Sequence, residues 1–183
     1  MASSVKAHLK ISVRTVGQLF NSLDPSPFYE RDLDADAEHY LVSWAEEFGR
    51  HAELELSVHL KEPPEEPDAE RWIPHAIHSH FRERARMTRA EFRRLMRLGR
   101  ASLLVGVAFL ALCLLLAELA GAADSTGVLA WFLRESLTIA GWVAMWRPLQ
   151  IYLYDWWPVL RRERLFAQMS QMPITLQIGA AGK

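Results

Sequence analysis

The most constraining feature of this chain is an uninterrupted apolar run over residues 101–123. The run holds 23 residues and one charged side chain, Glu118. A bilayer hydrocarbon core requires about 20 mostly apolar residues in helical form, and lipid offers no partner to an unpaired backbone group. Polar and apolar residues do not alternate along the run, which excludes a strand of a membrane barrel. The run therefore predicts a transmembrane helix, and the alternative is a long buried helix of a water-soluble protein.

A second apolar segment, residues 128–147, predicts a second transmembrane helix. The short polar stretch 124–127 separates it from the first run, and Pro148 follows it at once. Proline ends or kinks a helix because it has no N–H to donate. The expected fold is therefore an α-helical transmembrane hairpin of two spans, in which 124–127 is an external loop. A small cytosolic α+β domain precedes this hairpin.

Basic residues are concentrated next to the apolar segments. Residues 71–100 carry nine basic and two acidic side chains, whereas residues 1–70 carry 15 acidic and six basic side chains. Basic residues flank the cytoplasmic ends of membrane helices, and Trp and Tyr prefer the membrane–water boundary. The sequence therefore predicts a multi-pass protein with both termini in the cytoplasm. The residues expected at the lipid headgroups are Arg93, Arg94, Arg97, Arg100, Arg147, Trp156, Trp157, Arg161 and Arg162.

Three charged residues fall inside the apolar segments. In a hairpin with its tip near residue 125, Glu118 and Arg134 lie at one depth, about 9 Å inside the outer boundary. A charge at the bilayer centre costs at least about 2.5–3.5 kcal/mol, and an opposite charge lowers that cost. We therefore expect an ion pair between Glu118 and Arg134. Glu135 is left over as a candidate functional charge, which snorkels outward, pairs with a neighbouring chain or faces a polar cavity.

The N-terminal part of the chain has the pattern of a small mixed domain. Alternation of apolar and polar residues predicts strands at Val5–Val13 and Glu53–Leu60, paired through opposite charges. Between them, Asp34 is expected to cap a helix that runs to Phe48. A third strand is expected from the tail segment Ile174–Ile178 or from a second copy of the chain.

These elements predict the domain order of the whole chain. The cytosolic α+β domain covers residues 1–60 and a Pro/Glu-rich linker covers 61–73. A basic amphipathic helix over 74–100 continues into the first span, because no proline occurs between residues 75 and 147. An interfacial aromatic and basic segment with a cytosolic tail covers 148–183.

Two patterns resemble metal sites but fit them poorly. Asp32, Asp34 and Asp36 have the D-x-D-x-D spacing of an EF-hand loop, which needs Gly at its sixth position and Glu at its twelfth. This chain has Ala37 and Ser43 there, so helix capping explains the acids better. The histidines lack a Cys partner or an H-E-x-x-H pattern. We therefore expect no metal site from His75, His78 and His80, even if His39, His51 and His59 join them, and we expect the helix histidines to be solvated surface residues.

Two segments of the chain, LFNSLDPSPFYERDLDADAE and IAGWVAMWRPLQIYLYDWWP, resemble small bacterial two-span membrane proteins of unknown function. The resemblance covers residues 10–170, which is most of the chain. It implies a bacterial inner (plasma) membrane location. It implies no particular activity, so no functional residue is carried over from it.

The expected function is that of an integral membrane protein whose cytosolic domain is a tethered module for assembly, scaffolding or regulation. Its expected partners are membrane lipids and either further copies of the chain or a partner membrane protein. The alternative is a subunit of an oligomeric channel or transporter that uses the intramembrane charges. The sequence contains no recognisable nucleophile elbow, phosphate loop or Cys/His site, so neither an enzyme nor a cofactor is expected. Nucleic-acid binding is not expected, because membrane anchoring already accounts for the arginines.

Overall fold

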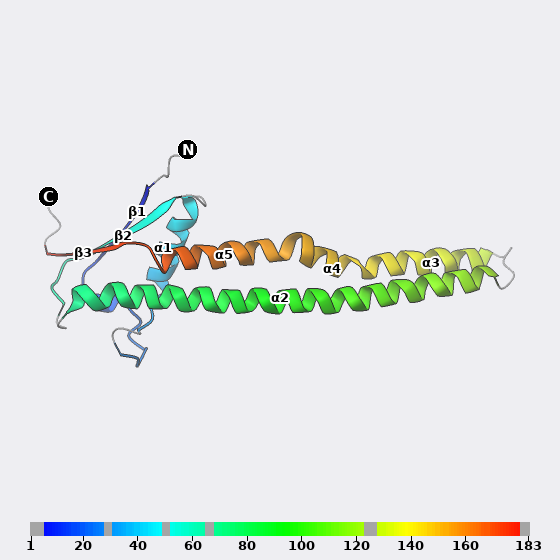
Figure 1. Ribbon diagram of the computed structural model, residues 1–183, viewed down its shortest axis with the longest axis horizontal. Helices are drawn as coiled ribbons and strands as arrows, with labels where there is room; N and C mark the ends of the chain where they lie inside the picture. Colours follow the sequence, from blue (N-terminus) through cyan, green and yellow to red (C-terminus); the bar gives the residue numbers. More distant parts are fainter. Residues whose placement is uncertain (1–5, 28–30, 49–51, 65–67, 123–127, 180–183) are drawn as a thin grey trace. The chain divides into compact units, whose positions relative to one another are not determined.

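A computed structural model describes residues 6–27, 31–48, 52–64, 68–122 and 128–179 (Figure 1). The chain divides into two compact units. Unit 1 combines Met1–Thr88 with Arg161–Lys183, and unit 2 is Arg89–Leu160. The segments before and after unit 2 therefore fold together.

Unit 1 is built on a three-stranded parallel sheet. Its strands are β1 (Lys6–Val13), β2 (Glu53–Leu60) and β3 (Ile174–Ile178), in the order β1-β2-β3 (Figure 1). The predicted pairing of the first two strands is confirmed, and the tail segment supplies the third strand. β3 pairs with β2 from Leu56↔Ile174 to Leu60↔Ile178, so the C-terminal tail is part of the folded sheet.

The two faces of the sheet differ because the side chains alternate along each strand. Ala7, Leu9, Ile11 and Val13 of β1 are buried, as are the four apolar residues of β2. On the opposite face, His8 Nδ1 lies 3.3 Å from Glu55 Oε2 across the strand pair. Opposite charges on paired strands were expected, and the β1–β2 register places them there.

The domain is not of the expected α+β type, because helices alternate with parallel strands. A parallel connection needs a crossover of a dozen or more residues, and α1 (Ala35–Glu47) supplies it between β1 and β2. Asp34 caps α1 as predicted: its Oδ1 accepts a hydrogen bond of 3.0 Å from the backbone N–H of Asp36. The second crossover, from β2 to β3, contains the whole of unit 2.

The hydrophobic core of unit 1 lies between the buried face of the sheet and three helices. It includes Leu41 from α1, Ile77 and Phe81 from α2, and Phe166 and Met169 from α5. All of these side chains are at most 4% exposed. The core therefore joins residues that lie far apart in the sequence on either side of unit 2.

The longest element is α2 (Ala69–Ala122), a continuous helix of 54 residues. It confirms that the basic segment runs into the apolar run without a break. It begins five residues earlier than predicted, because the carbonyl of Asp68 accepts hydrogen bonds from the N–H groups of Arg71 (2.9 Å) and Trp72 (3.2 Å). Burial of Ala69 and Ile73 in the core stabilises this added turn. Pro74 lies inside the helix and forfeits a single backbone hydrogen bond.

Unit 2 packs the later part of α2 against the chain that follows it. That chain forms α3 (Val128–Ala144), α4 (Trp146–Gln150), a π-helical turn at Ile151–Asp155 and the start of α5 (Trp156–Met169). Glycines allow the close approach. A Cβ on Gly141 of α3 would lie 2.7 Å from Leu110 Cδ1 and 3.3 Å from Cys113 Cβ of α2.

Pro148 interrupts the helical backbone as predicted. It cannot donate to the carbonyl of Ala144, its partner four residues earlier, so α3 ends there. The N–H of Met145 donates instead to the carbonyl of Trp142, at 3.1 Å. The chain resumes as α4 and then widens into the π-helical turn. α5 ends at Met169, ahead of Pro173.

The prediction of a two-span transmembrane hairpin is wrong. Among the described residues, one helix is long and apolar enough to cross a membrane, and that helix is α2. α3 has 17 residues, which at 1.5 Å per residue span about 25 Å, against about 30 Å for a hydrocarbon core. The predicted external loop, residues 124–127, lies outside the described residues.

Candidate functional site

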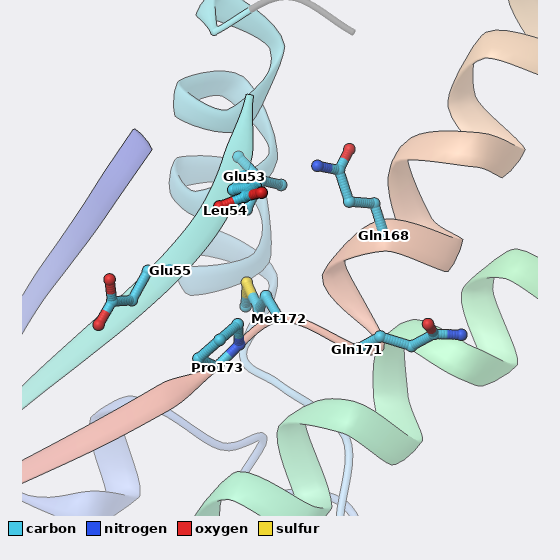
Figure 2. A pocket seen from close by; sticks show the side chains of 7 residues that line it. All are labelled: Glu53, Leu54, Glu55, Gln168, Gln171, Met172 and Pro173. Atoms are coloured by element: carbon cyan, nitrogen blue, oxygen red, sulfur yellow. The ribbon is translucent and has the colours of Figure 1, made fainter. Parts of the chain in front are cut away.

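A pocket of about 320 Å³ opens in unit 1 where β2 begins and α5 ends (Figure 2). Gln168 reaches from α5 toward β2, and its Nε2 donates to the carbonyl of Ala52 at 2.5 Å. Glu53 and Glu55 lie at its edge. Two carboxylates beside one pocket favour binding of a positively charged group over a negatively charged one. The rest of the lining is Leu54, Gln171, Met172 and Pro173.

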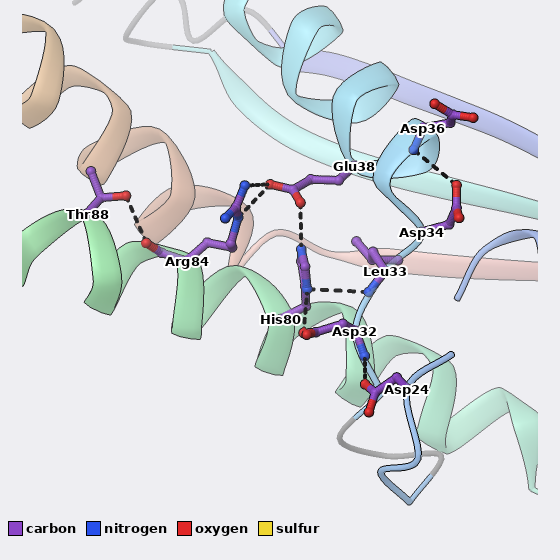
Figure 3. A network of polar contacts seen from close by, with 9 residues as sticks. All are labelled: Asp24, Asp32, Leu33, Asp34, Asp36, Glu38, His80, Arg84 and Thr88. Atoms are coloured by element: carbon purple, nitrogen blue, oxygen red, sulfur yellow. Dashed lines mark hydrogen bonds and ion pairs between the residues drawn. The ribbon is translucent and has the colours of Figure 1, made fainter. Parts of the chain in front are cut away.

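A polar network in unit 1 is centred on His80 of α2 (Figure 3). The imidazole is 6% exposed. Its Nδ1 lies 2.9 Å from Asp32 Oδ1 and 3.3 Å from the backbone nitrogen of Leu33. Nδ1 serves one of these partners at a time: as N–H it donates to the carboxylate, and as a lone pair it accepts from Leu33. Nε2 is 3.4 Å from Glu38 Oε2, so the ring lies between two carboxylates.

Glu38 connects this histidine to Arg84, which lies one helical turn further along α2. Arg84 Nε donates to Glu38 Oε1 at 2.6 Å, and the guanidinium also lies 5.7 Å from the centroid of the Phe166 ring. The Glu38 side chain is 15% exposed and that of Arg84 is 45% exposed. The network therefore ties α1, the segment before it and α5 to one face of α2.

The loop that carries Asp32 is itself held by a carboxylate. The backbone N–H of Asp32 donates to Asp24 Oδ2 at 2.8 Å, and that of Ser26 donates to Asp24 Oδ1 at 2.9 Å. The bond from Asp32, together with those from Ser26 and the charge of Arg31, holds the pKa of Asp24 below its ordinary value of 3.8. Asp24 is therefore ionised at neutral pH and keeps Asp32 beside His80.

The sequence interpretation of the histidines as solvated surface residues is wrong for two of them. His80 is buried, and His78 Nε2 lies 2.8 Å from the carbonyl oxygen of Met172. No group of three metal-binding side chains occurs among the described residues. The contacts of the network join an imidazole, two carboxylates and a guanidinium from α2, α1 and the segment before α1. We therefore interpret it as a structural link within unit 1.

A sequence signal for this network existed. His80, Phe81 and Arg84 lie on α2 within one turn of each other, and residues four apart on a helix share a face. His80 is adjacent to Phe81, an apolar residue of the predicted amphipathic helix. A histidine beside apolar residues lies near the core, and an arginine one turn later can contact the same acidic side chain. This arrangement favours contacts with buried acids. The partner acids, Asp32 and Glu38, could not be identified without the fold, because they lie more than 40 residues away.

The charges expected inside the apolar segments lie in unit 2. Glu118 Oε1 is 3.8 Å from Arg134 Nη2, so α2 and α3 bring the expected pair together. Both side chains are largely exposed, at 79% and 59%. Glu135 is exposed and has no ion-pair partner among the described residues.

The residues expected at the lipid headgroups lie in both units. Arg147 pairs with Asp155 at 3.7 Å, and Trp156 donates from Nε1 to the carbonyl of Tyr152 at 2.7 Å. The Trp157 side chain is 53% exposed. Arg94 and Arg97 line a pocket of unit 2. The remaining ones are exposed on α2 (Arg93, Arg100) or α5 (Arg161, Arg162).

Comparison of the chain with protein-family models, with curated proteins and with solved structures found no match. The resemblance to small bacterial membrane proteins therefore stays a prediction. The function has to be argued from the residues and their geometry.

Proposed function

We propose that this protein is a membrane-anchored module, in which unit 2 inserts into a lipid bilayer and unit 1 acts at the membrane surface in assembly or regulation. The observation that carries the proposal is the apolar surface of unit 2. Leu104, Val105 and Leu115 of α2 are 63–74% exposed, as are Trp131 and Trp142 of α3 at 65% and 68%. Soluble proteins rarely leave a contiguous apolar surface of this extent in water.

The alternative of a soluble core helix fits this surface poorly. A core helix is mostly buried, whereas 17% of the most apolar stretch of α2 is buried. The buried positions are few and small, such as Cys113 and Ala117, and they support packing by α3. Small residues at helix contacts are typical of proteins in lipid, where close packing replaces the hydrophobic effect. α3 is the element that packs on α2 at these positions.

The sidedness is proposed from the charges on α2. β3 pairs with β2, so the segments that flank unit 2 belong to one folded domain. The arginines of residues 82–100 favour the cytoplasmic side, since basic residues are enriched there. An acidic N-terminal part beside a basic helix suits contacts with protein partners and with anionic headgroups.

Membrane fractionation tests the anchoring. The full chain, expressed in bacteria, is expected to remain with the membrane pellet after extraction with alkaline carbonate and after extraction with high salt. Carbonate opens vesicles and removes proteins held only by charge, whereas lipid-embedded helices stay. Recovery of the wild-type chain in the carbonate supernatant would overturn the proposal.

The ion pair gives a second, independent test. Glu118→Leu and Arg134→Leu are each expected to destabilise the chain in lipid vesicles, and the double variant less than their sum. An exposed pair in water is worth only about 0.2–1 kcal/mol, so a larger coupling indicates a lipid environment. Glu118→Leu combined with Glu135→Leu is the control, and its effects should add. Additive effects in the first pair would contradict an intramembrane ion pair.

A subunit of an oligomeric channel is the second candidate function. Glu135 favours it, because this carboxylate is exposed on an apolar unit without an ion-pair partner among the described residues. Intramembrane charges are functional candidates by default. Ion flux through vesicles that contain the wild-type chain, and its loss in Glu135→Ala, would favour the channel over the tethered module.

A further inference from the structure

We infer that unit 2 carries a binding site for an anionic phospholipid, in a pocket between α2 and the start of α5. The pocket has a volume of about 800 Å³ and lies entirely within unit 2. The inference rests on the proposed membrane anchoring and adds the ligand class and the residues that select it. The lining residues are Glu91, Arg94, Leu95, Arg97, Leu98, Ala101, Asp155 and Val159.

The floor of the pocket is apolar and open. Leu95, Leu98, Ala101 and Val159 form it, and Leu98 is 50% exposed. Ala101 is the first residue of the apolar run, so this floor begins where the hydrocarbon layer begins under the proposed anchoring. An acyl chain laid along these side chains would cover apolar surface that is otherwise exposed.

Two arginines and two acids form the charged rim of the pocket, and Arg147, which lies outside the lining, adds a third positive charge. Arg94 and Arg97 are exposed, and neither forms an ion pair with a described residue. Asp155 also lines the pocket, but Arg147 lies 3.7 Å from its carboxylate and offsets its charge. Glu91 is the remaining acid, so the group as a whole has an excess of one positive charge. A guanidinium binds a phosphate with two parallel hydrogen bonds.

The spacing along α2 fits a lipid better than a free phosphate. Arg97 and Arg94 precede Ala101 by four and seven residues, which places them about 6 Å and 10 Å above the start of the apolar run. The headgroup layer outside the hydrocarbon is about 5–8 Å thick on each side, so the backbone of Arg97 falls within it and that of Arg94 lies just beyond it. One molecule with a phosphate at this height and acyl chains below it meets both the rim and the floor. Free phosphate would meet the rim alone.

The backbone beside the pocket contains an irregular helical turn. The π-helical turn at Ile151–Asp155 places Asp155 at the pocket and precedes Val159 by one helical turn. Such turns are rare and frequently occur at functional sites. Here the turn follows Pro148, and Gly99 of α2 gives it room: a Cβ on Gly99 would lie 2.9 Å from Ile151 Cγ2.

The test uses the full chain purified in a mild neutral detergent and fluorescently labelled phosphatidylglycerol as the probe. Wild-type chain is expected to bind it saturably, and Arg94→Gln with Arg97→Gln to weaken binding about tenfold. Arg82→Gln with Arg89→Gln, two exposed arginines of α2 that do not line the pocket, is the matched control. It removes two charges from α2 outside the pocket, and binding should change by less than about twofold. Equal losses in both double variants would overturn the site in favour of general charge attraction.

Three further measurements identify the class of ligand and distinguish failure of this site from failure of the proposed membrane anchoring. Ala101→Trp fills the floor and keeps every charge, so it should also weaken binding, and unchanged binding overturns the acyl-chain floor. Equal competition by glycerol 3-phosphate, or equal binding of phosphatidylcholine, overturns the anionic lipid. Carbonate extraction is carried out on the wild type and on each variant. If the wild type stays in the membrane but does not bind phosphatidylglycerol, this site alone is refuted. If carbonate extracts the wild type, the anchoring is refuted.

Discussion

Replacing Leu112 and Leu115 together with arginine is expected to remove the chain from the carbonate-resistant membrane fraction. Both side chains lie near the middle of the apolar part of α2 and are 51% and 63% exposed. An arginine at the centre of a membrane helix costs about 2.5–3.5 kcal/mol on insertion scales, so two cost roughly 5–7 kcal/mol. The expected result is a chain that is extracted by carbonate or degraded, measured by immunoblot of the two fractions.

The control for this prediction is Leu23→Arg in unit 1. Leu23 is 88% exposed, and its backbone N–H donates to Asn21 Oδ1. An arginine there meets only solvent, so the variant should fractionate like the wild type. If the double arginine variant stays in the membrane pellet to the same extent, the apolar surface of α2 does not contact lipid.

The second large effect is expected from Phe81→Ala. Phe81 is completely buried, and its ring centroid lies 6.3 Å from that of Phe166 and 5.3 Å from that of His80. Truncation of a buried phenylalanine typically costs about 3–5 kcal/mol through lost apolar burial and the cavity that remains. We expect unit 1 to lose that much free energy of unfolding, measured by pulse proteolysis of the full chain in detergent.

Met87→Ala is the matched control on the same helix. Its side chain is 56% exposed, so its truncation should cost less than about 1 kcal/mol. The comparison also tests the composition of unit 1. Phe81 precedes unit 2 and Phe166 follows it, so a large effect requires that both segments fold as one domain. Equal stability of the two variants would contradict that packing.

Much of the local structure was predictable because its causes act over a few residues. Alternation along the chain located β2 at its observed bounds, and the tail segment that forms β3 was one of two candidates for the third strand. The side chain of Asp34 reaches the N–H of Asp36, two residues away, and so identified the start of α1. Pro148 marked the end of a helix in the same way, because it lacks an N–H.

The candidate site was less predictable, because its partners are distant in the sequence. The Glu118–Arg134 contact was inferred only from equal depth in a proposed hairpin, yet the two residues do lie 3.8 Å apart. The prediction of a second span was wrong, because hydropathy does not show where a helix ends. Pro148 and the turn at Met145 limit α3 to 17 residues. The π-helical turn beside the lipid pocket likewise has no sequence pattern that identifies it.

The sequence by itself determined which segments are apolar, charged or capped, and so the existence of the strands, of α1 and of the uninterrupted α2. Only the tertiary structure decided that the strands are parallel, that β3 joins β2, and that His80 is buried between Asp32 and Glu38. The reason is physical: propensity, capping and proline effects are local, whereas strand direction and burial depend on contacts between residues that meet only when the whole chain has folded.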